Sequence, residues 1–107
     1  MAAYLVDSES SEQYALTEPL CKIGSATGNN LVLSFPDIQD SHVKIENRNG
    51  TFFICLMPGA SGMRKFLLFF DIPSAKHNGA TLDGNPKRLA NGDKVLIGSR
   101  LFEFRMT

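Results

Sequence analysis

Residues 77–98, HNGATLDGNPKRLANGDKVLIG, decide the fold of this chain. They contain three glycine turns in order, at Asn78-Gly79, at Asp83-Gly84 and at Asn91-Gly92. Asn and Asp tolerate a positive φ and Gly adopts it freely, so these pairs are strong signals for tight β turns. Short apolar runs lie between and after them, which is typical of a β-sandwich or barrel. The stretch contains no catalytic constellation.

The rest of the chain continues this pattern of short apolar runs separated by turn residues. In residues 42–46, Val43 and Ile45 alternate with polar residues, as on a strand with one buried face. No stretch has a convincing helical period. We therefore predict an all-β sandwich of two twisted sheets. Besides the short runs inside residues 77–98, strands are expected at residues 4–6, 14–16, 20–23, 31–33, 42–46, 51–57, 63–72 and 101–104.

Length and charge limit the possible functions. The chain has 107 residues, 43% of them hydrophobic and 21% charged, which is an ordinary globular balance. One domain over residues 1–107 is the natural count at this length. Lysines and arginines together number 11, equal to the aspartates and glutamates, so the net charge is zero. This balance argues against nucleic acid or an anionic membrane as the main partner.

The cysteines and the amino terminus bear on the compartment. Cys21 and Cys55 are isolated within apolar runs, so we expect buried reduced thiols rather than a zinc site. No secretory signal and no apolar run of membrane-spanning length is found. We expect an intracellular protein without metal or cofactor. Because the sequence starts with Met1, we expect this domain to be the amino-terminal one of a longer protein.

Catalytic residues are not indicated. Asp40, Ser41 and His42 are adjacent in sequence, but neighbouring side chains on a strand diverge, whereas a nucleophilic triad must converge. Asp83 and Asp93 are better explained as turn residues. We therefore predict that the chain is not an enzyme.

Several short motifs follow one another in a recognisable order. They are Ile23-Gly24, residues 30–33, residues 36–38, residues 42–45, residues 71–74, Asn78-Gly79, residues 82–84, Leu89, residues 92–98 and residues 101–104. No single motif is specific, but the ordered set resembles a divergent forkhead-associated (FHA) domain over about residues 4–106. The resemblance implies a sandwich of about eleven short strands. Such domains bind phosphothreonine peptides through loops at one end.

The resemblance also places a phosphopeptide site, in degenerate form. In the family an Arg directly follows the glycine of the third strand, and this position is Ser25 here. A phosphate-contacting Ser lies three residues before the family's His, and this position is Gln39, with Ser41 close by but out of register. The residue before Asn-Gly is usually Thr or Ser and is His77 here. The Asn that holds the peptide backbone is retained as Asn78.

Without these contacts, phosphate binding should be weak. A dianionic phosphate needs charge-assisted donors, above all an Arg. Losing the Arg and Ser contacts costs about 3–5 kcal/mol, which weakens binding about 10²–10⁴-fold. We therefore predict that phosphothreonine reading is lost. The alternative is that Lys22, Lys44, Lys76 or His77 replaces the Arg. His77 is either a locally bonded loop residue or a contact at an interface or anion site, whereas the retained His42 braces loops in the family.

Two apolar runs, residues 52–57 and 66–70, show no alternation. Both faces of these strands would then be apolar, and one face needs cover beyond the core. Leaving two Phe and two Leu side chains in water forgoes about 6–12 kcal/mol. We predict a homodimer through this face; the alternatives are burial by the excursion at residues 58–70 itself and a different protein partner. The predicted interface residues are Phe53, Cys55, Met57, Phe66, Leu68, Phe70 and His77.

These observations favour a protein-interaction module that acts mainly by self-association. The resemblance extends to dimerising amino-terminal FHA domains of proteins of the mediator of DNA damage checkpoint type. This would imply a nuclear DNA-damage-response scaffold whose valence the domain doubles. The alternatives are a phosphothreonine-peptide receptor with substituted phosphate contacts and a docking domain of a larger motor or kinase.

Overall fold

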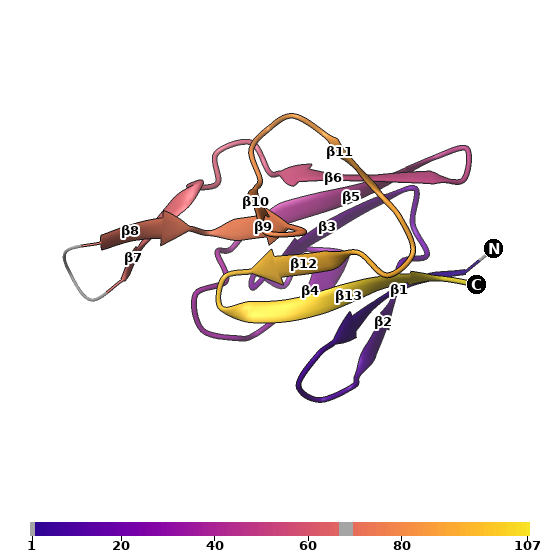
Figure 1. Cartoon of the computed structure of the whole chain (residues 1–107), viewed down its shortest axis with the longest axis horizontal. Coiled ribbons are helices and arrows are strands. Elements are labelled where there is room, and N and C mark those ends of the chain that lie inside the picture. Colours follow the sequence, from indigo (N-terminus) through magenta and orange to yellow (C-terminus); the bar gives the residue numbers. More distant parts are fainter. Residues whose placement is uncertain (1, 67–69) are drawn as a thin grey trace.

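The computed structural model describes residues 2–66 and 70–107, and within them the chain forms thirteen β-strands and no helix (Figure 1). Two sheets pack face to face, and a separate hairpin extends from one end. The all-β sandwich predicted from the sequence is confirmed, with thirteen strands where about eleven were expected. No helix in the described residues is long and apolar enough to cross a membrane.

The first sheet, here called sheet A, has six strands in the order β10-β9-β12-β13-β1-β2. Its strands are β1 (Ala3–Asp7), β2 (Gln13–Ala15), β9 (Ala75–His77), β10 (Ala80–Thr81), β12 (Lys94–Ile97) and β13 (Arg100–Met106). β1 and β13 are antiparallel neighbours, so the two ends of the chain lie together: the amide of Thr107 donates to the carbonyl of Ala2 at 2.9 Å. Both termini therefore leave the sandwich at the same end (Figure 1).

The second sheet, sheet B, has five strands in the order β11-β6-β5-β3-β4. Its strands are β3 (Leu20–Gly24), β4 (Leu31–Val32), β5 (Val43–Arg48), β6 (Thr51–Leu56) and β11 (Lys87–Leu89). The alternation predicted for residues 42–46 is confirmed, since Val43 and Ile45 are buried and Lys44 and Glu46 face outward. Sheet B thus has one apolar inner face and one outer face rich in charge.

The core lies between the two sheets. Phe102 and Phe104 of β13 and Leu5 of β1 are fully buried against sheet B. The ring of Phe52 on β6 packs on that of Phe104, with centroids 5.4 Å apart. Both cysteines are buried and free, and burial raises the pKa of Cys21 to about 11, so its thiol stays protonated at neutral pH.

The third element is the hairpin of β7 (Met63–Phe66) and β8 (Phe70–Pro73), which form a two-stranded sheet of their own. Phe66 pairs with Phe70 and Met63 with Pro73. The single strand predicted over residues 63–72 is therefore wrong. A continuous apolar run without Gly, Pro or Asn gives no signal for where the chain reverses. In Figure 1 the hairpin extends away from both sheets, at the end opposite the termini.

The glycine turns behave differently from one another. Asn78 and Gly79 have φ values of 49° and 83° and join β9 to β10, so this predicted tight turn is confirmed. Asp83-Gly84 instead lies in the connection from sheet A to sheet B, and the prediction of a tight hairpin turn there is wrong. The carbonyl of Asp83 accepts the amide of Leu56 at 2.7 Å, which ties this connection to the end of β6.

Two glycines, one from each sheet, fix the loop that precedes β5. A Cβ on Gly24 would lie 2.2 Å from the carbonyl oxygen of Asp40, and one on Gly98 would lie 2.4 Å from that of Asp37. Gly98 also has a φ of 62°, which side chains disfavour. Only glycine therefore lets the loop at residues 37–40 lie against both sheets, and this loop carries much of the candidate site.

Candidate functional site

Three of the predicted site residues lie together at the loop end of the sandwich. The amide of Ser25, just after β3, donates to the carbonyl of Gln39 at 3.0 Å. The hydroxyl of Ser25 bonds the carboxylate of Asp40 at 3.3 Å. Gln39, Asp40 and Ser41 line an open hollow of about 470 Å³ against the loop that follows β6. The structure therefore brings Ser25, Gln39 and Ser41 to one surface.

Both polar atoms of the Gln39 side chain bond the backbone of Ser61. Its Nε2 donates to the carbonyl of Ser61 at 2.8 Å, and its Oε1 accepts the amide of Ser61 at 2.8 Å. Ser61 is further bound through Ser74, whose hydroxyl donates to the same carbonyl at 2.6 Å. Gln39 thus ties two loops together, and one N–H and one oxygen lone pair of its side-chain amide are already used.

The charge at this hollow is negative. The exposed Asp40 lies beside Ser25, and Ser25 is the position at which the family has its phosphate-binding Arg. The arginine described near this loop, Arg64 on β7, lies with Nη1 3.4 Å from a carboxylate oxygen of Asp37. Among the described residues, none of those that line the hollow is a Lys or an Arg. A dianionic group placed there would meet a carboxylate instead of a guanidinium.

His42 supports the site from beneath. It is completely buried, and its Nδ1 accepts the amide of Gln39 at 3.2 Å. Burial lowers the pKa of His42, and a bond to the backbone of Ser74 opposes this only in part, so the ring is neutral at pH 7. His42 therefore braces the loops, as its place in the family pattern implies.

His77 and Asn78 lie elsewhere. His77 ends β9, which runs antiparallel to β12, and Asn78 follows it. The amide of Asn78 donates to the carbonyl of Lys94 at 2.8 Å, and its Oδ1 accepts the amide of Lys94 at 2.7 Å. Val95, which pairs with His77, lies three residues before Gly98, which contacts the loop at residues 37–40. Three residue steps along a strand span about 10 Å, which is also the length of about three residues of an extended peptide. His77 and Asn78 are therefore not among the residues that line the hollow at Gln39 and Asp40.

His77 is a locally bonded residue. Its Nε2 lies 2.7 Å from the Oδ2 of Asp93, and both side chains are largely buried. The same Asp93 oxygen accepts the amide of Ala90 at 2.8 Å and closes the turn before β12. Burial raises the pKa of Asp93, but the bonds from His77 and Ala90 outweigh this and hold it below its usual range. The arrangement fits the first of the two interpretations given for His77.

Two contributors to this site were missed in the sequence. Neither Asp40 nor Ser61 is among the residues that the sequence predicts for this site. Ser61 lies 22 positions from Gln39, and a contact at that separation leaves no local sequence pattern. Asp40 directly follows Gln39, so its charge was visible, but its contact with Ser25 depends on how the loop is held by Gly24.

The outer face of β6 is better covered than predicted. Its inner-facing residues belong to the core, and of those facing outward Cys55 is only 4% exposed while Met57 is half-buried. The half-buried Phe53 is covered in part by Arg48, whose guanidinium carbon lies 4.8 Å from the ring centroid. β6 therefore leaves less apolar surface uncovered than the sequence predicts, because Arg48 of the neighbouring strand β5 lies over Phe53.

Among the described residues, the two most exposed large apolar side chains lie on the hairpin. Phe70 is 59% exposed and Met63 45% exposed, both more than Leu101, which is 40% exposed on sheet A. The predicted interface residue Leu68 and the side chain of Phe66 lie outside what the structure describes. In the described residues, no group of three His, Cys, Asp or Glu side chains is placed to hold a metal ion.

Comparison with known families decides the assignment. The sequence model of the FHA domain matches residues 21–98. This chain belongs to the FHA domain family. The resemblance inferred from the order of motifs is thereby confirmed, and FHA domains are protein-interaction modules. No curated protein sequence matches the chain significantly.

Solved FHA structures share the fold at low sequence identity. The Mycobacterium tuberculosis protein EmbR, solved with a low-affinity phosphopeptide, matches 99% of this chain with a TM-score of 0.81 and 21% identity. The match covers 24% of the EmbR chain. A structure from a study of phosphothreonine-dependent FHA interactions matches with a TM-score of 0.79 and 18% identity, covering 100% of this chain and 98% of the other. The FHA domain of CT664 from Chlamydia trachomatis matches with a TM-score of 0.76 and 17% identity, covering 100% of this chain and 99% of the other.

Proposed function

We propose that this FHA domain is a non-enzymatic protein-interaction module that no longer reads phosphothreonine at its loop end and acts mainly by self-association. The observation that carries the proposal is the hydrogen bonding of Ser25 and Gln39 at the loop end. The Asp40 carboxylate bonds Ser25, and the amide of Gln39 is taken by the backbone of Ser61. The two positions that would bind phosphate therefore offer a negative charge and an occupied side chain.

The energetic argument is direct. Replacing the Arg and Ser contacts by Ser25 and Gln39 costs about 3–5 kcal/mol, and the nearby Asp40 carboxylate adds repulsion. Freeing the Gln39 amide would break two hydrogen bonds to Ser61, which contribute about 1–3 kcal/mol together. These terms place phosphothreonine binding outside the micromolar range.

Self-association is supported by the hairpin. Phe70 and Met63 expose large apolar surfaces on an element that extends away from both sheets. Hairpins of two copies can pair about a two-fold axis, which is the commonest closed arrangement of homo-oligomers. The zero net charge of the chain opposes such pairing less than a strongly charged chain would. The predicted contribution of Phe53 and Cys55 is replaced in this proposal by Met63.

Two measurements test the proposal. Light scattering coupled to size exclusion should give the mass of a dimer at micromolar concentration. Calorimetry with phosphothreonine peptide libraries should give no saturable heat in the same range. A strictly monomeric mass at high concentration contradicts self-association, and saturable micromolar binding of a phosphothreonine peptide contradicts the loss of phosphate reading.

A second candidate is a phosphothreonine-peptide receptor with substituted contacts. It is supported by the solved FHA structures at similar fold, one with a low-affinity phosphopeptide and one from work on phosphothreonine-dependent interactions. The hydroxyls of Ser25 and Ser41 would be the remaining neutral donors. This candidate predicts that Asp40→Asn strengthens phosphopeptide binding about tenfold by removing the like charge.

Narrower roles stay predictions. A nuclear location, a scaffold of the mediator of DNA damage checkpoint type, and a docking domain of a motor or kinase rest on the sequence resemblance alone. The family match and the structural similarities add nothing to them.

A further inference from the structure

The outer face of sheet B carries cations that lack acidic partners. Lys22 on β3 lies directly opposite Lys44 on β5, and Arg88 on β11 lies opposite Phe53 on β6. Within residues 2–66 and 70–107, no carboxylate lies within ion-pairing distance of Lys22, Lys44 or Arg88. These residues define a surface here called the basic face.

The pairing of Lys22 with Lys44 works against folding. Like charges directly opposite each other on one face of a sheet are destabilising. On the described strands of this face, the carboxylate of Glu46 is already bonded to Arg48. Acidic and basic residues are equal in number over the chain, so the excess of positive charge on this face comes from how the fold distributes them. An acidic partner would relieve it.

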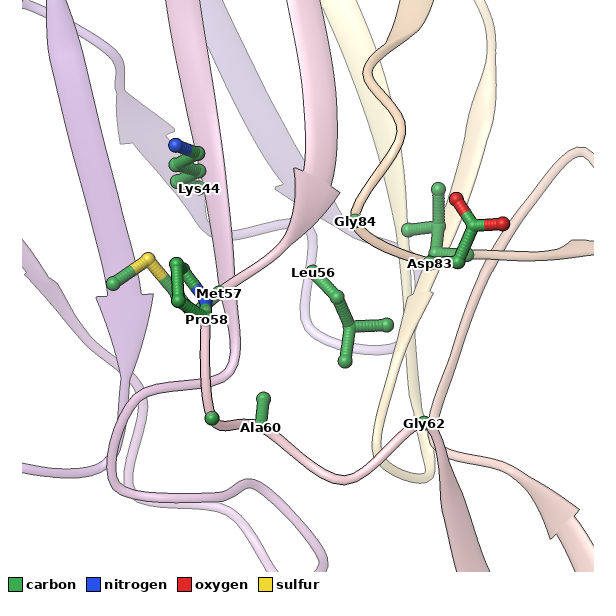
Figure 2. Close-up of a pocket in the computed structure, with 10 residues that line it drawn as sticks. Lys44, Leu56, Met57, Pro58, Ala60, Gly62, Asp83 and Gly84 are labelled. Atoms are coloured by element: carbon green, nitrogen blue, oxygen red, sulfur yellow. The ribbon is translucent and has the colours of Figure 1, made fainter.

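An apolar groove of about 480 Å³ continues the basic face at the end of β6 (Figure 2). Lys44 stands at one rim, and the carboxylate of Asp83 at the other rim is turned away from Leu56. Oδ1 of Asp83 accepts the amide of Asn85 at 2.8 Å, so this carboxylate is used within its own loop. The apolar side chains that line the groove are Leu56, Met57, Pro58, Ala60 and Leu82.

We propose that the basic face binds a short acidic peptide segment containing bulky apolar residues. Lys22 and Lys44 pair with its carboxylates, and the groove beside Leu56 takes an apolar side chain. The inference rests on the proposed role as a protein-interaction module and is independent of the hairpin and of self-association. A nucleic acid fits less well, because backbone recognition takes a longer array of cations and here an apolar groove adjoins the lysines.

The test uses fluorescence anisotropy with a fluorescein-labelled peptide of glutamates interspersed with leucine and phenylalanine. Two matched peptides carry glutamine in place of glutamate, or serine in place of leucine and phenylalanine. We expect saturable binding of the first peptide that weakens with added salt, and binding about tenfold weaker for each matched peptide. Lys44→Glu should weaken binding about tenfold, whereas Arg105→Glu on sheet A, with the same change in net charge, should not.

Lys22→Glu separates binding from stability. It converts a repulsive pair with Lys44 into an attractive one, so it should raise the melting temperature by about 1–5 °C while weakening peptide binding. A purely structural lysine would not show opposite effects. Lys44→Gln serves if Lys44→Glu does not fold, and should weaken binding about threefold.

Three results would overturn the inference. They are no saturable binding of the acidic peptide at millimolar concentration, equal effects of Lys44→Glu and Arg105→Glu, and tighter binding of a single-stranded oligonucleotide through the same lysines. Light scattering on the same samples keeps the two proposals apart. A dimer that ignores the peptide removes only this inference, and a monomer that binds it removes only self-association.

Discussion

Replacing Phe70 by glutamate should prevent the proposed self-association and leave a folded monomer. Phe70 lies on β8 of the hairpin and exposes 59% of its surface. A Phe side chain buries about 150–250 Å² when fully covered, so about 120 Å² of Phe70 remains for a partner to cover. At about 25 cal/mol per Å², that area is worth about 3 kcal/mol.

The symmetry of a dimer doubles this term. A two-fold interface buries Phe70 of both copies, which makes about 6 kcal/mol, and a micromolar dimer is held by about 8 kcal/mol. Losing the term weakens association by about 10⁴-fold, and the buried charge of glutamate adds to the loss. The Phe70→Glu variant should therefore be monomeric at every workable concentration.

Light scattering and thermal unfolding together check this result. The melting temperature should stay within a few degrees of the wild-type monomer, since the hairpin lies outside the core. Leu101→Glu is the matched control, because Leu101 is 40% exposed on sheet A and lies on another element. Dimers that persist in Phe70→Glu, or that are lost equally in Leu101→Glu, would refute the assignment of the interface to the hairpin.

Three further predictions concern the fold and the loop end. Gly98→Ala should destabilise the domain by about 2–4 kcal/mol in urea unfolding, because the added Cβ would lie 2.4 Å from the carbonyl oxygen of Asp37 and the φ of residue 98 is 62°. Gly28→Ala is the control: its Cβ would meet nothing within 4 Å, so it should cost less than about 1 kcal/mol. Burial raises the pKa of Asp7, but bonds from a guanidinium and two amides outweigh it and lower that pKa overall. The ionised Asp7 therefore stabilises the fold above the unfolded pKa of about 3.9, and this stabilisation is lost as pH falls through the folded pKa. Asp7→Asn should lower the melting temperature at pH 7, and its difference from the wild type should narrow below about pH 4. A pH-independent difference would contradict this account. Gln39→Ala should cost about 1–3 kcal/mol and speed hydrogen exchange at the amide it holds, with unchanged exchange counting against its bridging role.

Local patterns in the sequence accounted for most of the fold. The alternation at Val43 and Ile45 and the turn at Asn78-Gly79 depend on neighbours in sequence, so they were predictable. The reversal between Phe66 and Phe70 was not, because residues 66–70 form an apolar run that contains no turn residue. The turn of a hairpin sets the register of its strands, and an apolar run contains no residue that indicates where the turn lies.

The candidate site was predictable in part. Ser25 and Gln39 could be placed together because the family pattern fixes both relative to a glycine and a histidine. His77 does not line the hollow with Gln39, because β9 pairs with β12 and the ring of His77 bonds Asp93. The cover over Phe53 was also missed, since it comes from Arg48, whose position over the ring depends on strand register rather than on local pattern.

Ala2 and Thr107 lie side by side, so both ends of the chain are at the same end of the domain. Both ends of the chain lie at one end of the 44 Å long axis, and the hairpin lies at the other end (Figure 1). In the proposed pair, two copies joined hairpin to hairpin would hold their termini roughly twice that length apart, facing opposite ways. Any segments attached to the two copies would then search separate volumes, and short linkers would keep them from reaching a common ligand. Such a pair would act as a spacer that selects targets by the distance between their sites.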